Sequence, residues 1–538
     1  MTIKDPIAEG LDGAWKVINA AAVDGTLELE ADVVITGSGA GGGIAAEILS
    51  QAGLHVVLLE EGPLRSSRDF KMDEAEAYET LYQQAAGRTT SDGGIAILQG
   101  RSVGGGTTIN WTSSFRTPEQ TLNHWTDVHG LKGFEPETMK PWFERVEQRL
   151  NIQKWVGALN GNNAALQQGC QSLGWAWAPI PRNVKGCWNL GYCGLGCPTN
   201  AKQSMLVTTI PSSLNSGATL IHHCRAEKLA MAGDQVDALH AVAINENGRR
   251  LNLPRIRIKA RHYVLSCGAI GSPALLLRSK APDPHGTLGK RTFLHPSSLS
   301  MAEMPSKIEP FYGAPQTIYS DHFQWRDGAT GPVGYKLEVT PMHPMFTALF
   351  AGGHGADHRD RMEKLPHLQT VVALLRDGFV AESSGGQVLL NDDGSPVLDY
   401  QMNDYLWAGV RRAMLSMAEL QFAAGAKSVR PCHQNAEAYK SWAQAEAGIK
   451  ALPMETYRAL IGSAHVMGGC CMGEDPKQSV VNSSGQHHQL TNLSVFDGSE
   501  FPTSIGANPQ ESIFAMVSRQ AESLARQLNG SLALGKTL

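Results

Sequence analysis

The chain has 538 residues, of which 42% are hydrophobic and 18% charged, enough for two or three domain cores or one large two-lobed unit. The formal net charge of −5 argues against a nucleic-acid partner. No apolar run reaches the roughly 18 to 20 residues that a membrane-spanning helix needs. Because no basic segment followed by an apolar one opens the chain either, the sequence predicts a cytoplasmic protein, unless a partner carries it to the periplasm or a membrane.

The first element along the chain is a predicted amphipathic helix with Ile7, Leu11, Trp15 and Ile18 on its apolar face. Residues 31–63 then have the pattern of a dinucleotide-binding βαβ unit. In order, they contain an apolar strand (33–36), a Gly-rich turn (37–42), a helix (44–52), a second apolar strand (56–59) and Glu60.

Three glycines of the turn have distinct expected roles. Gly37 permits the tight turn, Gly39 lets the backbone approach a pyrophosphate, and Gly42 lets the helix pack close to the strand. The carboxylate of Glu60 can accept hydrogen bonds from both ribose hydroxyls of an adenosine. A Gly-rich turn in an unrelated α/β protein is the alternative, but the complete order of elements favours nucleotide binding.

A second Gly-rich stretch, GRSVGGGTTINW, occupies residues 100–111. Three consecutive glycines and two threonines give a backbone that can lie flat against a planar or anionic ligand. An ordinary Gly-rich loop is the alternative. Helical patterns follow over residues 134–173, strand patterns over 218–223 and 256–266, and a turn with a helix over 267–279.

Residues 299–455 have a different pattern of apolar and polar residues from the rest of the chain. This pattern predicts an antiparallel sheet with one helix, inserted into the rest of the chain. Alternating apolar residues over 333–339 predict a half-buried strand. Residues 388–390 and 397–400 predict a hairpin, and Asp404 is expected to cap a long helix. The chain closes with an amphipathic helix bearing Ile513, Phe514, Val517, Ala521 and Leu524.

Four stretches together resemble the glucose–methanol–choline (GMC) family of flavin oxidoreductases. They are GSGAGGG, GRSVGGGTTINW, CGAIGSPALLLRS, and HVMGG with NLSVFDGSEFPT and NPQES. The resemblance implies an α/β fold (α+β overall) in which a Rossmann-like FAD-binding domain carries an inserted antiparallel-sheet substrate domain. The expected FAD-binding domain comprises residues 1–65, 95–115, 205–298 and 456–538. The expected substrate domain comprises residues 66–94, 116–204 and 299–455, with a cysteine loop at 185–204.

The resemblance also implies a bound FAD and the residues that hold it. The expected set is Gly37, Gly39, Gly42 and Glu60 at the adenosine and pyrophosphate, Ala226 at the adenine, Arg101, Gly104, Gly105, Thr107 and Asn110 along the ribityl chain and flavin, and Asp497 over the pyrophosphate and ribityl region.

Oxidation of an alcohol by a flavin requires a base that removes the hydroxyl proton while a hydride leaves the carbon. Imidazole suits this role because its pKa lies near working pH. His465 matches the first active-site histidine of the family, and Asn508 matches the second position. We therefore predict His465 as base and Asn508 as hydrogen-bond partner of the substrate oxygen. The alternative for His465 is a satisfied core histidine, and His295, His487 and His488 have weaker claims.

Cys187, Cys193 and Cys197 fall within eleven residues of a Gly-rich loop. Thiolates at such spacing can converge on one centre, and a cysteine followed by proline is frequent at iron–sulfur sites. The spacing resembles that of bacterial FAD-dependent sugar dehydrogenases, which implies a [3Fe–4S] cluster that passes electrons to a cytochrome. Three unligated thiols or one structural disulfide are the alternatives.

The resulting hypothesis is an FAD-dependent dehydrogenase that oxidises a primary, hydrophobic alcohol to its aldehyde. Similarity to long-chain alcohol oxidases favours this substrate class. Electrons would pass through the cluster to a cytochrome or quinone, with a separate small subunit as a further expected partner. The alternatives are an oxygen-using alcohol oxidase, a sugar dehydrogenase of the same family, and a flavoprotein subunit without turnover.

Overall fold

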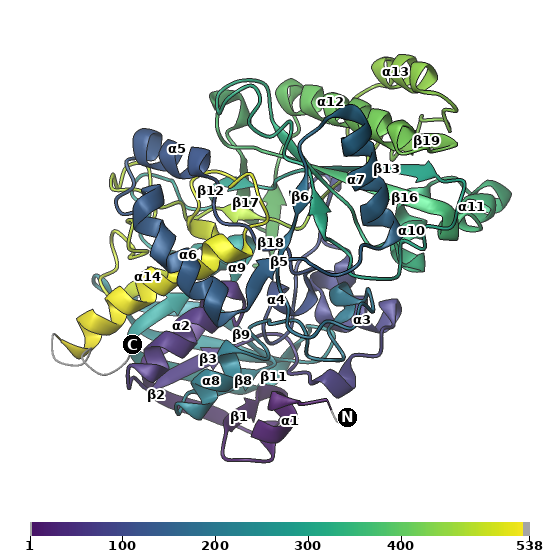
Figure 1. Ribbon diagram of the computed structural model, residues 1–538. Helices are drawn as coiled ribbons and strands as arrows, with labels where there is room; N and C mark the ends of the chain where they lie inside the picture. The colour runs from purple at the N-terminus through teal and green to yellow at the C-terminus, as the bar shows by residue number, and fades with distance from the viewer. Residues whose placement is uncertain (1–2, 531–538) are drawn as a thin grey trace.

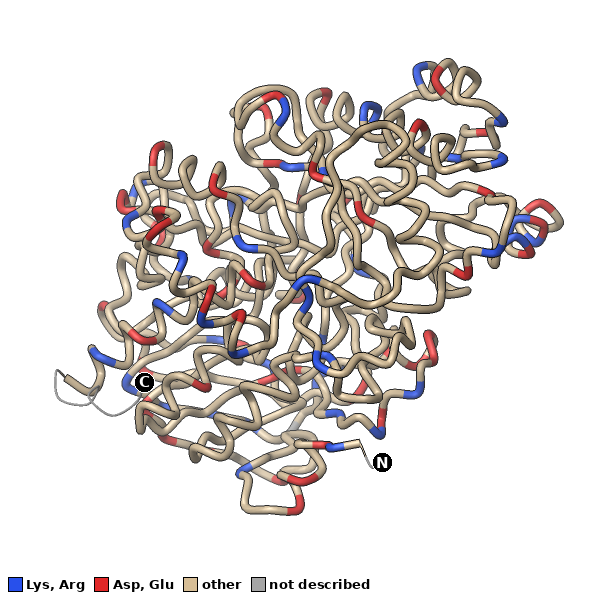
Figure 2. The backbone as a smooth tube through the Cα atoms, in the orientation of Figure 1, with Lys and Arg blue, Asp and Glu red and all other residues tan. Residues whose placement is uncertain are grey.

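The computed structural model describes residues 3–530, which form two large sheets and the helices around them. The eight-stranded sheet lies at the bottom of Figure 1, and the six-stranded sheet lies at the upper right, beneath helix α12. Acidic and basic residues are interspersed over both parts (Figure 2), in keeping with the small net charge. The described residues contain no helix that is long and apolar enough to cross a membrane.

The eight-stranded sheet contains the predicted βαβ unit at its centre. Its strands run in the order β1-β8-β3-β2-β11-β10-β9, with β22 also pairing β11. Neighbours from β1 to β11, and the β11–β22 pair, are parallel, whereas β9, β10 and β11 pair antiparallel. The bounds are β1 (Lys16–Asn19), β8 (Thr219–His222), β3 (Val56–Leu59), β2 (Thr26–Thr36), β11 (Arg250–Leu265), β10 (Gln235–Ile244), β9 (Cys224–Ala232) and β22 (Leu493–Val495).

Apolar residues explain why β2 and β3 are central. Residues 33–35 and 56–59 are all buried, as expected for parallel strands covered on both faces. Helix α2 (Ala40–Gln51) packs against both strands, and α14 (Gln510–Asn529) packs against α2 and α6 (Pro136–Arg149). The face of α14 with Phe514, Val517 and Ala521 is fully buried, so the C-terminal amphipathic helix predicted from the sequence is present.

The six-stranded sheet is antiparallel except for the parallel pair β20–β4. Its order is β15-β16-β13-β20-β4, with β19 on β13. Helix α12 (Asp404–Ala423) packs against β13 and β16 and against α7 (Gly161–Leu173). The strand bounds are β15 (Tyr335–Glu338), β16 (Leu368–Leu375), β13 (Ser297–Glu303), β20 (Ile461–Ser463), β4 (Ile95–Ile97) and β19 (Ser428–Pro431).

Smaller sheets and helices complete the fold. A four-stranded antiparallel sheet contains β18 (Pro396–Asp399), β17 (Gly386–Leu390), β12 (Lys290–Phe293) and β21 (Met467–Gly468). Two short pairs join β14 (Ile318–Tyr319) to β6 (Ala178–Pro179) and β5 (Ile152–Lys154) to β7 (Pro181–Asn183). The remaining helices are α1 (Pro6–Leu11), α3 (Glu74–Leu81), α4 (Gly106–Ile109), α5 (Glu119–His129), α8 (Thr209–Asn215), α9 (Gly268–Ser279), α10 (Pro344–Ala351), α11 (Gly355–Met362) and α13 (Trp442–Ala451).

The mixed α/β fold with a nucleotide-type sheet and an antiparallel sheet is confirmed, whereas three local predictions are wrong. Helix α1 ends at Leu11, and the region that contains Ile18 forms β1, which pairs with β8. The N-cap of α12 is Asn403, whose side chain accepts from the N–H of Leu406, and Asp404 is the first helical residue. Strand β15 is buried on both faces rather than on one.

The division of the chain into two domains stays a prediction. Strands β4 and β20 fall within residues 95–115 and 456–538, which the sequence places with the cofactor. Both strands are nevertheless hydrogen-bonded into the six-stranded sheet. The chain therefore crosses between the two large sheets at both places, and His465 follows directly after one of these crossings.

Candidate active site

Three glycines of the first Gly-rich turn have no room for a side chain. Gly37 has φ +92°, and a Cβ there would lie 2.3 Å from the carbonyl oxygen of Ser266. A Cβ on Gly41 would lie 1.8 Å from the carbonyl oxygen of Phe496, and one on Gly42 would lie 1.8 Å from that of Gly37. These contacts bring the start of α2 directly against the ends of β11 and β22.

The second Gly-rich loop lies against the first. A Cβ on Gly105 would lie 2.7 Å from the Cα of Gly39, and the N–H of Gly104 donates to the hydroxyl of Ser38 at 2.9 Å. Helix α2 begins after Gly39 without a side-chain cap, so its first N–H groups remain available to an anion. The two loops form a cradle of bare backbone at a helix N-terminus.

Glu60 stabilises this cradle through hydrogen bonds to Ser38 and Gly62. Its carboxylate accepts from the backbone N–H and the hydroxyl of Ser38, at 3.1 and 2.6 Å, and from the N–H of Gly62 at 2.9 Å. Burial raises the pKa of Glu60, and these hydrogen bonds oppose that shift. Since Oε1 has a single protein donor, it retains capacity for a further one, such as a ribose hydroxyl.

The other predicted cofactor residues contribute buried polar groups around the cradle. Arg101 is 4% exposed, its Nη2 donates to the carbonyl of Glu246, and its Nη1 has no hydrogen-bond partner among the described residues. The hydroxyl of Thr107 accepts from the N–H of Met205 at 3.0 Å. Asn110 donates to Gln510 at 2.7 Å and so ties the loop to α14.

Asp497 lies just after the end of β22, and Ala226 lies near the start of β9. Asp497 accepts from the N–H of Gly268 at 2.8 Å and from the hydroxyl of Ser272 at 2.6 Å, which fixes the start of α9. Ala226 lies on β9, whose first residue, Cys224, donates its N–H to the carbonyl of Glu60 at 2.9 Å. The bare cradle, the uncapped helix and the guanidinium nitrogen Nη1 of Arg101 together fit a dinucleotide such as FAD.

His465 forms a close pair with His295. Their Nδ1 atoms are 3.1 Å apart and their rings are tilted by 32°. Burial lowers the pKa of His465 to about 3, and the charge of Lys336 acts in the same direction. Burial also holds the pKa of His295 well below its ordinary value. Both imidazoles are therefore neutral at pH 7, and a contact at this distance requires one Nδ1 to donate and the other to accept.

His295 is held by its backbone. It has φ +50°, and Asp377 accepts from the N–H groups of Leu294 and His295, each at 3.0 Å. The hydroxyl of Tyr400 also donates to Asp377, at 2.8 Å. From the sequence alone His295 has a weaker claim than His465 because no motif surrounds it, and only the fold brings the two side chains together.

Asn508 lies between two charged residues of β15. Its Oδ1 accepts from Lys336 at 3.2 Å, and its Nδ2 donates to Glu338 at 3.3 Å. Because the charge of Lys336 also acts on the pKa of His465 and His295, Asn508 and the two histidines share one electrostatic environment. The sequence does not single out Lys336 and Glu338, because polar residues that alternate with apolar ones in a half-buried strand predict a solvated face. His487 and His488 contact neither histidine.

The cysteine loop contacts the second Gly-rich loop through Lys202. The buried ammonium of Lys202 donates to the carbonyls of Thr108, Asn110 and Cys193, each at 2.7 Å. Burial lowers the pKa of Lys202 to about 8. The Sγ of Cys193 is 3.8 Å from a guanidinium nitrogen of Arg182.

The cysteines are all free thiols in this structure, which does not contain the structural disulfide considered above. Within residues 3–530, no three or more His, Cys, Asp or Glu side chains are arranged to hold a metal ion. Cys187, Cys193 and Cys197 as placed therefore do not fit a cluster, and no catalytic step is assigned to one.

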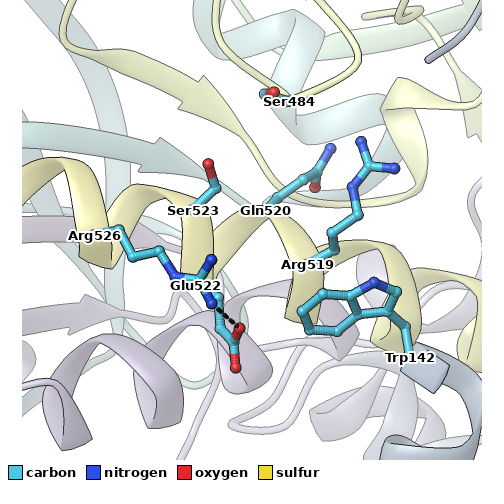
Figure 3. Close-up of a pocket in the computed structure, with 7 residues that line it drawn as sticks. All are labelled: Trp142, Ser484, Arg519, Gln520, Glu522, Ser523 and Arg526. Carbon is cyan, nitrogen blue, oxygen red and sulfur yellow. Dashed lines mark hydrogen bonds and ion pairs between the residues drawn. The ribbon is translucent and has the colours of Figure 1, made fainter. Parts of the chain in front are cut away.

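A separate cavity lies along α14 (Figure 3). It is lined by charged and polar side chains of α14 together with Trp142 and Ser484. None of the predicted site residues lines it, and one of its residues, Glu522, is engaged in ion pairs with Arg145 and Arg526.

Comparison with known proteins agrees with the resemblance seen in the sequence. Residues 78–297 and 381–516 match the models of the N- and C-terminal parts of GMC oxidoreductases. A long-chain-alcohol oxidase of Arabidopsis thaliana is 27% identical, over 93% of this chain and 68% of its own. A GMC-type oxidoreductase of Mycobacterium tuberculosis is 29% identical, over 93% of this chain and 76% of its own.

Solved structures show the same fold at low sequence identity. A formate oxidase of Aspergillus oryzae superposes with a TM-score of 0.70 at 14% identity, over 95% of this chain and 100% of that one. A pyridoxine 4-oxidase of Mesorbium loti superposes with a TM-score of 0.64 at 17% identity, over 91% and 98%. The chain therefore belongs to the GMC oxidoreductase family, as an FAD-dependent oxidoreductase acting on CH–OH donors.

Proposed function

We propose that the protein oxidises a primary, hydrophobic alcohol to its aldehyde. The observation that carries this proposal is the neutral imidazole pair of His465 and His295, which is subject to the charge of Lys336, the residue that donates to Asn508. A neutral imidazole can accept the hydroxyl proton of an alcohol, and the amide N–H of Asn508 can donate to its oxygen. The long-chain-alcohol oxidases of Arabidopsis thaliana that match over 91–94% of this chain support the alcohol class.

An apolar cluster supports a hydrophobic substrate over a sugar. Phe346 of α10 contacts Trp111, at the end of the second Gly-rich stretch, with ring centroids 6.4 Å apart. Met342 and Phe346 are buried, and Met345 and Leu349 are 46% and 72% exposed. These apolar side chains extend from the second Gly-rich stretch to the surface, and such a lining suits an alkyl or aryl chain.

FAD, when bound, supplies the acceptor for the hydride that leaves the carbinol carbon. The chain's own residues would hold the alcohol and move its proton. His465 would take the hydroxyl proton on a ring nitrogen, and His295 would hold the ring through the Nδ1 contact. Asn508 would orient the substrate oxygen, and the surrounding apolar residues would exclude water.

The proposal is tested by anaerobic reduction of the bound flavin with 1-dodecanol and with glucose. We expect bleaching of the flavin absorbance with dodecanol and little with glucose; the reverse preference would favour the sugar dehydrogenase. His465→Ala should slow the reduction by about 10²- to 10⁴-fold while flavin content is kept. His285→Ala, at an exposed position, is the matched control and should reduce at the wild-type rate.

For the electron acceptor we retain two candidates. The spacing of Cys187, Cys193 and Cys197 in the sequence supports a [3Fe–4S] cluster and transfer to a cytochrome or quinone, whereas the placement of these thiols among the described residues does not fit one. The names of the Arabidopsis relatives support oxygen. Iron and acid-labile sulfide analysis of protein purified without air separates them. About three irons per flavin would support the cluster. Iron-free flavoprotein that forms peroxide at the rate of dye reduction would support the oxidase.

A further inference from the structure

The strand β15 carries an ion pair that is almost completely buried. Lys336 and Glu338 are 3% and 0% exposed as side chains, and Nζ lies 3.0 Å from Oε1. Removing both charges from water carries a large desolvation penalty, and an apolar pair of similar size is often as stable or more so. Structural stability therefore does not explain why this strand carries the pair.

The contacts of the pair converge on Asn508. Lys336 donates to its Oδ1 at 3.2 Å, and its Nδ2 donates to Oε2 of Glu338 at 3.3 Å. With the ion pair itself, these bonds close a ring of three residues. If the amide were reversed, its NH₂ group would face the ammonium and its oxygen would face the carboxylate, and both contacts would be repulsive.

Aromatic rings enclose the remaining side of the ammonium. Nζ lies 2.9 Å from the ring centroid of Phe115 and 4.7 Å from that of Tyr319. Lys336 is therefore surrounded by a carboxylate, an amide oxygen and π faces, and it is not free to reach a substrate itself. Asn508, by contrast, has two N–H bonds on Nδ2, of which Glu338 accepts one.

We infer that Lys336 and Glu338 are positioning residues that hold Asn508 in one amide orientation, with its second Nδ2–H left to donate to the substrate oxygen. This inference rests on the proposed function, because it concerns how that site binds an alcohol. A donor in this place stabilises the negative charge that develops on the oxygen as the proton leaves.

The ammonium has a second effect on the same site. The titratable groups that act on His465 are His295 at the Nδ1 contact and Lys336 from β15. Burial is the main reason why His465 is unprotonated, and the positive charge of Lys336 acts in the same direction. The buried pair thus orients the hydrogen-bond donor and adds to the effect of burial on the base.

The test is the double variant Lys336→Met/Glu338→Gln, which removes both charges at similar volume. We expect kcat with dodecanol to fall by about tenfold to a hundredfold with little change in KM, because the lost donor acts in the transition state. The control removes another ion pair, Arg145→Met/Glu522→Gln, which joins α6 to α14 and should leave kcat unchanged.

A second readout does not depend on turnover. Histidine ¹³Cε1–¹H resonances of the flavin-loaded protein, assigned with His465→Asn, report the protonation of His465. We expect its titration to move to higher pH in the double variant, because the nearby positive charge is gone. If the wild type fails to oxidise any alcohol, the proposed function fails, and this titration still tests the electrostatic part of the inference.

Unchanged kcat together with an unchanged His465 titration in the double variant would overturn the inference. Should the double variant lose its flavin, Glu338→Gln tests the same point at equal size. A glutamine there can accept from Lys336 or from Asn508 but cannot replace both acceptor oxygens, so kcat should still fall. Wild-type kcat in that variant would be the contrary result.

Discussion

At His465, burial and a nearby ammonium act on the pKa in the same direction. The imidazole with a pKa of about 3 is neutral across the pH range in which proteins usually work, so proton uptake by His465 is not limited by its own charge state. The pKa of Lys336, lowered by burial to about 8, falls within that range. Lys336 is charged below pH 8 and neutral above it.

The pH profile of the wild-type enzyme follows from these two values. We expect kcat/KM for an alcohol to show no inflection between pH 5 and 7, where an ordinary histidine titrates, and to decline above about pH 8 as Lys336 loses its charge. Steady-state rates from pH 5 to 9.5 measure this. The double variant at 336 and 338 should lack the alkaline decline, and a wild-type inflection near pH 6.5 would contradict the assignment.

Residues 335–338 show why part of the site could not be predicted from the sequence. Tyr335 and Leu337 alternate with Lys336 and Glu338, and such alternation predicts one buried face and one solvated face. Here the second face is covered by Phe115, Tyr319 and Asn508, which come from distant parts of the chain. The alternation of apolar and polar residues predicts the strand correctly. It cannot distinguish a polar face exposed to solvent from a polar face buried in a site.

At the level of elements, most helices and strands were visible in local patterns, and their ends were less so. The apolar face of α12 predicts the helix, but the cap expected at Asp404 lies one residue earlier, at Asn403. Asn403 and Asp404 are both good N-cap residues, and local sequence does not choose between them. The structure chooses Asn403, whose side chain reaches the N–H of Leu406.

Substitution of each residue checks this assignment. Asn403→Ala should destabilise the protein by about 1 kcal/mol, because the helix loses its cap. Asp404→Ala should cost only a few tenths of a kcal/mol, since it removes a favourable charge from the first turn. Thermal unfolding of the flavin-loaded variants measures the difference, and a larger loss of stability in Asp404→Ala would restore the original assignment.

On the scale of the whole molecule, the cofactor cradle is assembled from segments that are far apart in sequence. The turn at Gly37 lies under Ser266, the second Gly-rich loop lies on Gly39, and Gly41 contacts Phe496. Motifs identify each segment, but the junctions between them depend on the order of strands β2, β11 and β22, which local patterns do not contain.

Alanine substitution at two glycines with similar φ angles can separate the cost of a steric clash from the cost of backbone strain. Gly37 and Gly53 have φ of +92° and +85°, but a Cβ on Gly53 would meet nothing within 4 Å. Gly53→Ala should cost about 1 kcal/mol of stability and keep the flavin. Gly37→Ala should displace the turn and purify with little flavin. The flavin-to-protein absorbance ratio measures both, and equal loading would contradict a close-packed cradle.

Lys202 joins the cysteine loop to the second Gly-rich loop with a single ammonium group. Because its three N–H bonds end on Thr108, Asn110 and Cys193, neither loop can shift without stretching a bond to the other. A shift of the backbone at Cys193 would therefore be transmitted to Thr108 and Asn110, in the loop expected along the flavin. The same three hydrogen bonds would carry a shift of the Gly-rich loop back to the cysteine loop, so the positions of the two loops are linked.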